Sequence, residues 1–220
     1  MNAKNEQAQN PPGLWAGQSL HALCLIGLLA VLWRVWVWLG EPYPVAFWIA
    51  AFTPVAHQIY VWLTWRLELN SQSISRTLGF GGYVAVFFML FGGRFLSLMW
   101  LAWLDHGSAG LSLFSQVGLT LACAVPGLYA MYSVKRYFGM KRAAGADHFD
   151  ARYRSMPLVR QGIFRLTNNG MYVYAFLLFW AIAFGFNSAT AIAVAAFSHA
   201  YIWVHHFATE RIDMAYLYRD

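Results

Sequence analysis

The residues best suited to chemistry stand on either side of the last apolar region of the chain. Before it lies Gly162-Ile163-Phe164-Arg165-Leu166-Thr167-Asn168-Asn169-Gly170-Met171-Tyr172, and after it lies Thr209-Glu210-Arg211. If the region between them forms two helices of similar length that turn near residues 186–188, both groups return to the same side. A carboxylate, a guanidinium, two amides, a phenol and the free N–H groups of a helix start then share one pocket. These groups suit a zwitterionic ligand that carries an amine, a carboxylate and a ribose.

Two other interpretations of these residues stay open at this point. The groups also fit a plain cap at the membrane surface, in which an asparagine caps the following helix and Glu210 pairs with Arg211 or a neighbour. His205 and His206 lie just before the second group. They fit either a proton acceptor or an interfacial anchor. A metal site is not expected, because adjacent histidines point to different faces of a helix and no cysteine cluster accompanies them.

Composition indicates a membrane protein. Of the 220 residues, 60% are hydrophobic and 11% are charged, whereas a soluble domain carries about 25% charged residues. We expect a single integral membrane domain over residues 1–220. Its first apolar run, residues 15–39, is too long for the core of a signal peptide and is expected to be retained. Cys24 and Cys123 fall in apolar runs and suit packing.

Six apolar runs predict an all-α, polytopic bundle of about six transmembrane helices. They cover roughly residues 17–39, 45–66, 78–104, 110–132, 171–186 and 189–207. Helices are expected because backbone polar groups in lipid must be satisfied within the segment. The fifth run spans only about 24 Å as a helix. The chain therefore divides into four spans (1–132), a basic link (133–170), and a C-terminal hairpin and tail (171–220).

Lysine and arginine predict the orientation. The links near residues 41–44, 105–110 and 185–188 contain neither residue, whereas the link 133–170 carries eight. Lys4 precedes the first run, and Arg219 follows the last one. This asymmetry predicts both termini in the cytoplasm, in the inner membrane of a bacterium or the endoplasmic reticulum of a eukaryote. The net charge of +6 indicates contact with anionic lipid headgroups rather than nucleic acid.

The C-terminal motifs resemble those of membrane-embedded methyltransferases. That group includes phosphatidylethanolamine N-methyltransferase and isoprenylcysteine carboxyl methyltransferase. The matching residues, over about residues 125–220, are Gly162, Phe164, Arg165, Asn169, Tyr172 and Glu210. Asn169-Gly170-Met171-Tyr172 resembles the Asn-Pro-Met-Tyr form of the phospholipid enzymes. Tyr137-Phe138-Gly139, at the foot of the fourth predicted span, also resembles the phospholipid branch of the family.

Three positions depart from the family pattern. Gly170 replaces the usual proline, Tyr174 replaces a common glycine, and Thr209 stands where many members have a second acid. Glycine loosens a helix start that proline would fix. These differences bear on the choice of acceptor more than on the reaction class.

The resemblance implies S-adenosyl-L-methionine as the cofactor. The cofactor site expected from it consists of Gly127, Tyr137, Gly162, Arg165, Asn168, Asn169, Tyr172, Glu210 and Arg211. Within this set, Glu210 and Arg211 would hold the polar parts of the cofactor. Pro126-Gly127 also fits a simple helix kink.

The implied activity is methyl transfer to a membrane-borne acceptor, with an ethanolamine phospholipid amine as the best candidate. An amine must lose a proton before it attacks, and His205, His206 and Glu210 are the candidate acceptors. A prenylcysteine carboxylate or a small thiol would use the same cofactor site. A non-enzymatic membrane protein and an NADPH-dependent sterol-type reductase are the alternatives from other classes.

Arg34 and Arg94 are charges inside apolar runs. Such a charge indicates function by default. In the predicted topology both arginines fall in the outer half of their spans, where their side chains can snorkel to the membrane surface, and structural pairing, for example with Glu41 or Asp105, is favoured.

Overall fold

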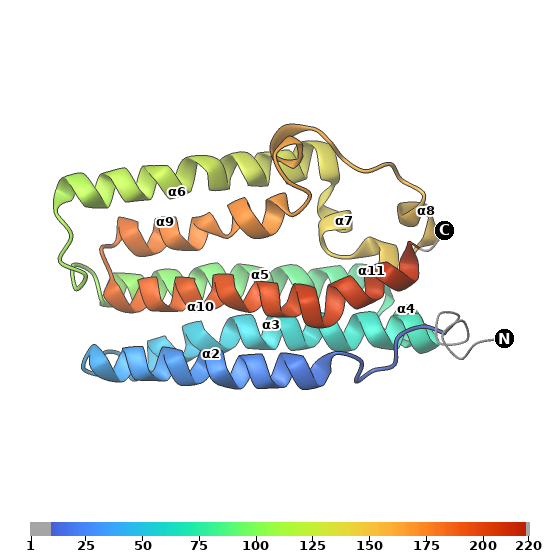
Figure 1. Ribbon diagram of the computed structural model, residues 1–220, viewed down its shortest axis with the longest axis horizontal. Helices are drawn as coiled ribbons and strands as arrows, with labels where there is room; N and C mark the ends of the chain where they lie inside the picture. The colour runs from blue at the N-terminus through green and yellow to red at the C-terminus, as the bar shows by residue number, and fades with distance from the viewer. Residues whose placement is uncertain (1–9, 219–220) are drawn as a thin grey trace.

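The computed structural model describes residues 10–218, and all regular structure in that range is helical. Four helices are long and apolar enough to cross a membrane: α2 (Gln18–Trp38), α3 (Pro44–Ser71), α5 (Gly79–Leu104), and α6 (Leu113–Ser133) with its extension η1 (Val134–Phe138). Figure 1 shows them running roughly parallel to one another, with α9 (Leu177–Gly185) between α5 and α6. The predicted all-α membrane bundle is confirmed, and the count of six spans stays a prediction.

The C-terminal region forms the expected hairpin. Its first arm is η4 (Met171–Ala175) followed by α9 (Leu177–Gly185), and its second arm is α10 (Ala189–His205). The chain then continues through η5 (His206–Glu210) into α11 (Arg211–Leu217). Both η4 and η5 are π-helical turns, a form that is frequent at functional sites.

The basic link is shorter than predicted and partly helical. Residues 134–138 extend α6, so Lys135 and Arg136 lie on a helix rather than in a loop. The rest of the link contains α7 (Met140–Ala143), η2 (Ala146–His148), α8 (Ala151–Arg154) and η3 (Gly162–Arg165). A short helix, α4 (Ser73–Thr77), joins α3 to α5.

Helix α10 lies at the centre of the bundle and contacts α2, α3, α5 and α9 (Figure 1). Its buried residues include the fully enclosed Ala191, Ala195 and Tyr201. Alanines allow close helix approach, which matters in lipid because apolar side chains gain little by leaving it. Helix α6 stands further out and packs on α9.

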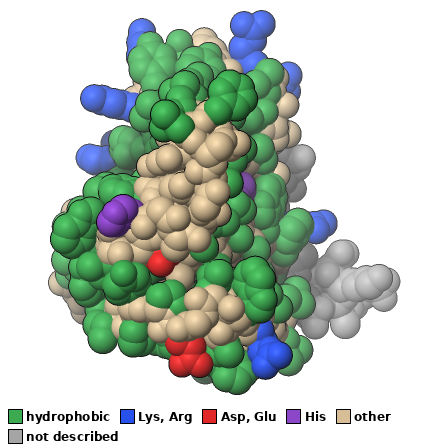
Figure 2. Space-filling model, turned by 90° about the vertical axis from the view of Figure 1, so that its left-hand side faces the viewer, with side chains coloured by type: hydrophobic (Ala, Val, Ile, Leu, Met, Phe, Trp, Pro, Cys, Tyr) green, Lys and Arg blue, Asp and Glu red, His purple; other side chains and the backbone are tan. Residues whose placement is uncertain are grey.

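The outward faces of the helices are apolar. Large exposed side chains include Leu23, Val31, Leu96, Phe114 and Val125. Figure 2 looks onto the end of the bundle that carries the α2–α3, α5–α6 and α9–α10 links, where hydrophobic side chains predominate and the blue Lys and Arg side chains stand mostly at the rim. A surface of this kind suits lipid.

The two ends of the bundle differ in their polar groups. At the end shown in Figure 2, Asp105 accepts hydrogen bonds from Ser188 Oγ (2.7 Å), Thr190 Oγ1 (2.6 Å) and Ser108 Oγ (2.7 Å). Burial alone would raise the pKa of Asp105, but these hydroxyl donors hold it below its usual value. The link 139–170 and α11 lie at the opposite end, and both ends of the described chain lie there too (Figure 1). Lys4 and Arg219 lie outside the described residues.

Candidate functional site

The two feet of the hairpin meet through one carboxylate. Tyr172 on η4 donates a hydrogen bond to Oε2 of Glu210 on η5. Nδ1 of His206 lies 3.0 Å from the same oxygen. The side chains of His206 and Glu210 are each 19% exposed, so the group is partly accessible. Arms of similar length therefore bring Tyr172 level with Glu210, as the hairpin predicted.

Of the two contacts that the plain-cap interpretation predicts, the asparagine cap is absent and the pairing of Glu210 with a neighbour is present. Gly170 is the residue before η4, and no side chain caps that segment. Arg211 is exposed, and Glu210 contacts His206, its neighbour one helical turn earlier, which that interpretation also allowed. The Glu210 carboxylate therefore contacts a phenol and an imidazole.

The segment before the hairpin is docked onto the end of α6. Gly162 has a φ of +60° and stands so close to Ser133 and Tyr137 that a Cβ would collide with them. The next N–H, that of Ile163, donates to Ser133 Oγ at 3.1 Å. Glycine is required there both for the left-handed backbone and for the close approach.

Two of the departures from the family pattern have local causes. A Cβ on Gly170 would lie 3.0 Å from Ile163 Cγ2, so glycine permits this packing. Thr209 is buried and accepts a hydrogen bond from Gln18 Nε2 at 3.1 Å. A hydroxyl rather than a second acid therefore faces α2.

The remaining predicted cofactor residues are spread around this foot or away from it. Arg165, Asn168 and Arg211 are exposed, Asn169 is half-buried, and Tyr137 lies beneath the guanidinium of Arg136 at 5.7 Å.

Gly127 lies against α9. A Cβ there would be 2.8 Å from Leu178 Cδ2. Its immediate environment is a helix contact, and its assignment to the cofactor stays a prediction.

His205 points away from His206 and toward the bundle interior. It is buried, its ring lies 5.7 Å from that of Trp65, and its Nδ1 has no hydrogen-bond partner among the described residues. The two histidines therefore belong to different environments, as adjacent helical residues do.

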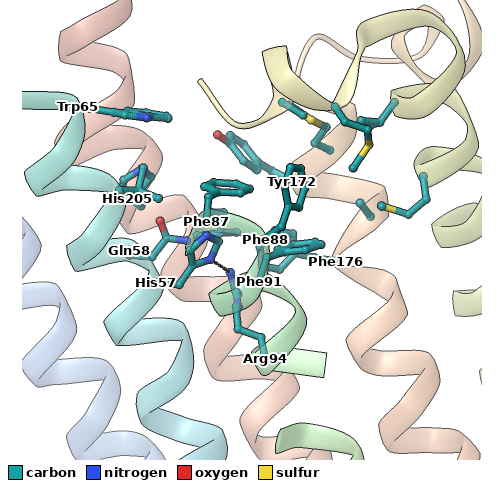
Figure 3. A pocket seen from close by; sticks show the side chains of 18 residues that line it. His57, Gln58, Trp65, Phe87, Phe88, Phe91, Arg94, Tyr172, Phe176 and His205 are labelled. Atoms are coloured by element: carbon teal, nitrogen blue, oxygen red, sulfur yellow. Dashed lines mark hydrogen bonds between the residues drawn. The ribbon is translucent and has the colours of Figure 1, made fainter. Parts of the chain in front are cut away.

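A cavity of about 110 Å³ begins where His205 points. It lies between α3, α5 and α10 on one side and η4, α6 and α7 on the other, and Figure 3 shows its lining. Aromatic rings form much of the wall: Phe87, Phe88, Phe91, Tyr172 and Phe176. Tyr172 thus belongs both to the cavity wall and to the Glu210 contact.

The predicted pairing of Arg94 was wrong. Asp105 is held by hydroxyl groups, whereas Arg94 lines the cavity and its Nη1 lies 3.3 Å from His57 Nδ1. The guanidinium also sits 5.1 Å above the rings of Phe176 and Phe179. Arg34 is exposed on α2, and no ion pair joins it to Glu41 within residues 10–218.

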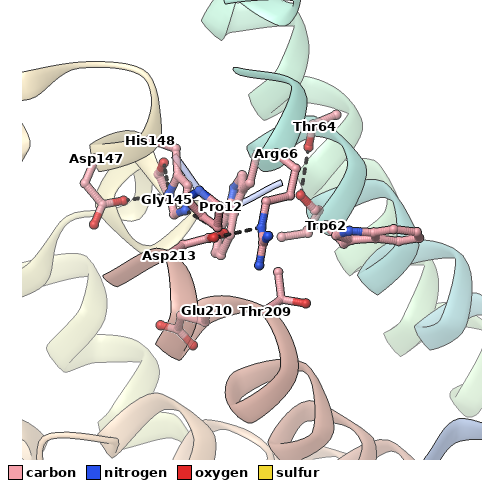
Figure 4. Close-up of polar contacts among 12 residues, drawn as sticks. Pro12, Trp62, Thr64, Arg66, Gly145, Asp147, His148, Thr209, Glu210 and Asp213 are labelled. Atoms are coloured by element: carbon pink, nitrogen blue, oxygen red, sulfur yellow. Dashed lines mark hydrogen bonds and ion pairs between the residues drawn. The ribbon is translucent and has the colours of Figure 1, made fainter. Parts of the chain in front are cut away.

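A buried ionic cluster beside the foot was not predicted. Arg66 Nε lies 2.7 Å from Asp213 Oδ1, and both side chains are fully buried. His148 bridges to Asp213 (3.4 Å) and Asp147 (3.2 Å), as Figure 4 shows. Tyr218 donates to Asp147 at 2.9 Å. The sequence feature that could have indicated this cluster is Asp213, a second acid one helical turn after Glu210.

Burial and pairing shift the titration of this cluster in opposite directions. Burial alone would lower the pKa of His148, but its contacts with Asp147 and Asp213 raise it above the usual value. Burial alone would raise the pKa of Asp147, but His148 and Tyr218 lower it. The charged forms of both partners are therefore favoured.

Comparison with known proteins adds one finding. Residues 109–220, which include the whole hairpin and its polar foot, match the family model for phospholipid methyltransferases. No curated protein and no solved structure gives a significant match.

Proposed function

The chain belongs to the phospholipid methyltransferase family, and from this we propose that it transfers a methyl group from S-adenosylmethionine to a lipid-borne acceptor. The observation that carries the proposal is the contact of Tyr172 and His206 with Glu210. These three residues lie inside the matched region and at the foot of a membrane hairpin. We place that foot at the cytoplasmic face, because the Lys- and Arg-rich link lies at the same end.

The donor set at the foot fits the polar part of the cofactor. Glu210 has hydroxyl and imidazole partners and makes no ion pair with Lys or Arg in the described part of the chain. It would hold an ammonium group or ribose hydroxyls. The exposed neighbour Arg211 supplies a cation for a carboxylate.

The cavity is partly open, and the space inside it is too small for the whole cofactor. Its volume of about 110 Å³ is below the roughly 300 Å³ at which sites for ligands of such size begin. The rest of the cofactor would lie against exposed parts of the segment 162–170, where Arg165 and Asn168 stand.

The protein's contribution to the reaction would be positioning and exclusion of water. Bound S-adenosylmethionine supplies an electrophilic methyl group on a sulfonium, whose charge disperses during transfer. The rings of Tyr172, Trp203 and His206 pack edge to face against one another, and two of them, Tyr172 and His206, contact the Glu210 carboxylate. His206 or Glu210 would accept the proton that an amine acceptor must lose.

We propose an ethanolamine phospholipid as the acceptor, reached from the bilayer. The test uses the purified protein in vesicles of phosphatidylethanolamine or phosphatidylglycerol with methyl-labelled S-adenosylmethionine. Label should enter the ethanolamine lipid alone, Glu210→Gln should abolish incorporation, and the exposed Glu41→Gln should retain it. Incorporation into neither lipid would reject the assignment of an ethanolamine phospholipid as the acceptor. Full incorporation by Glu210→Gln would reject the assignment of Glu210 to the site.

A further inference from the structure

The membrane interior of the bundle contains hydrogen-bond donors that no protein group uses. Arg94 is buried, and its Nε and Nη2 have no hydrogen-bond partner among the described residues. His57 Nε2 is likewise buried and without a partner. Buried donors normally find acceptors, so these three atoms need an explanation.

The contact between Arg94 and His57 determines whether these three atoms are hydrogen-bond donors or acceptors. A guanidinium only donates hydrogen bonds, so His57 Nδ1, 3.3 Å from Arg94 Nη1, must be the acceptor. A neutral imidazole that accepts at Nδ1 carries its proton at Nε2. The unused groups on Arg94 and His57 are therefore all donors.

The charge of Arg94 is also uncompensated by any carboxylate in the described chain. The described ion pairs do not include it. The rings of Phe176 and Phe179, each 5.1 Å away, offset part of the charge. An arginine inside a membrane span is costly unless it meets an anion, water or a partner.

The two residues that carry these donors line an apolar cavity. Arg94, His57 and His205 converge on it, while rings and thioethers form most of the remaining wall (Figure 3). The thioethers are those of Met131, Met140 and Met171, all only partly buried. Methionine walls adapt to different apolar chains.

The size of the cavity limits what it encloses. An engineered cavity of about 150 Å³ holds benzene, so 110 Å³ accommodates a smaller group. A carboxylate or phosphate with its first carbon atoms fits, and a longer chain must leave the cavity toward the membrane.

We propose that this cavity binds the anionic oxygen group of a membrane amphiphile, with Arg94 and His57 as its donors. Because Tyr172 lines the cavity and also contacts Glu210, the bound molecule lies beside the proposed methyl-transfer site. The assignment of this molecule as the methyl acceptor rests on the proposed function. The inference that the cavity binds an anion is independent of that function. The oxyanion is either the phosphate of a phospholipid or the carboxylate of an apolar acid.

The test measures equilibrium binding of dodecyl phosphate, dodecanoate and dodecyltrimethylammonium to the purified protein. We expect saturable binding of an anion, and Arg94→Met should weaken it at least tenfold. Arg34→Met is the matched control, because Arg34 is an exposed intramembrane arginine, and it should bind as the parent protein does. Ala175→Leu, which fills the cavity without removing a charge, should also weaken binding. Tighter binding of the phosphate supports a phospholipid, and tighter binding of dodecanoate supports an apolar acid.

Three results would overturn the proposal. The first is unchanged anion binding by Arg94→Met, and the second is binding of the ammonium compound that depends on Arg94 as strongly as anion binding does. The third is loss of S-adenosylhomocysteine binding in Arg94→Met, which would place Arg94 in the cofactor site. Anion binding through Arg94 by a protein that binds no S-adenosylhomocysteine would support the cavity assignment and reject the proposed function.

Discussion

At the scale of single residues, Glu210 differs from the other acids near the foot because its partners can be exchanged. Asp213 is committed to the buried Arg66, and Asp147 to His148 and Tyr218. Glu210 instead meets Tyr172 and His206 in a partly open setting. A carboxylate of this kind can accept a cationic or hydroxyl-bearing ligand without leaving a buried arginine unpaired.

The two adjacent histidines should respond differently to substitution. We expect His206→Ala to lower kcat about 100-fold, since removal of a general base typically costs 10²–10⁴ in rate, and to leave S-adenosylhomocysteine affinity nearly unchanged. His205→Ala should affect kcat less, because His205 faces the cavity rather than Glu210. The measurement is kcat of both variants from pH 6 to 9. Full turnover by both across that range would remove histidine from the proton transfer.

At the scale of elements, hydropathy was sufficient to locate the helices. The predicted runs at 17–39, 78–104 and 171–186 differ from α2, α5 and the η4–α9 arm by one residue at each end or less. Lipid imposes this outcome, since an apolar segment there must satisfy its own backbone. The link could not be predicted in this way. Its helices are only three to five residues long and contain no long apolar run, and they depend on docking contacts such as that of Ile163 N–H with Ser133 Oγ.

The contact between α6 and α9 provides an element-scale prediction. Gly127→Ala should destabilise the protein by about 1–3 kcal/mol, because the new Cβ would meet both the side chain and the backbone of Leu178. Gly118→Ala is the matched control on the same helix, with nothing within 4 Å of its Cβ. It should be neutral or stabilising by up to about 1 kcal/mol. Thermal unfolding in detergent measures both. A Gly127→Ala protein of normal stability that no longer binds S-adenosylhomocysteine would assign this glycine to the cofactor.

At the scale of the whole molecule, the buried cluster joins four segments that are distant in sequence. Arg66 on α3 binds Asp213 on α11, donates to the carbonyl of Gly13 (2.6 Å), and lies near His148 of the link (Figure 4). No local pattern predicts such a contact, because each residue alone resembles an ordinary interfacial charge. The contact between Tyr172 and Glu210 was predictable from a local pattern, because two helical arms of similar length bring their outer ends to the same level.

Removal of one charged partner from the buried cluster should strongly reduce the stability of the protein. We expect Asp213→Asn to cost about 3–5 kcal/mol, because it leaves Arg66 buried without its counter-charge. The unfolding temperature should fall accordingly. Asp150→Asn is the control, since Asp150 makes an exposed pair with Arg152, and its unfolding temperature should change far less. Equal effects of the two substitutions would contradict a structural role for the cluster.

The cluster should also make stability depend on pH. The raised pKa of His148 provides stability that is complete below its unfolded value of 6.5 and is lost as pH rises through the folded value. The lowered pKa of Asp147 provides stability that is present above 3.8 and is lost as pH falls through its folded value. The unfolding temperature should therefore fall as pH rises above about 6.5. His148→Gln should flatten that fall, and the exposed His106→Gln should retain it.

The most direct test of the central claim is calorimetric binding of S-adenosylhomocysteine to the purified protein, with NADPH measured in parallel. We predict saturable binding of S-adenosylhomocysteine, no binding of NADPH, and loss of at least 100-fold in affinity in Glu210→Gln, with Glu41→Gln unchanged. Absence of binding at millimolar S-adenosylhomocysteine, or binding of NADPH in its place, would contradict the account.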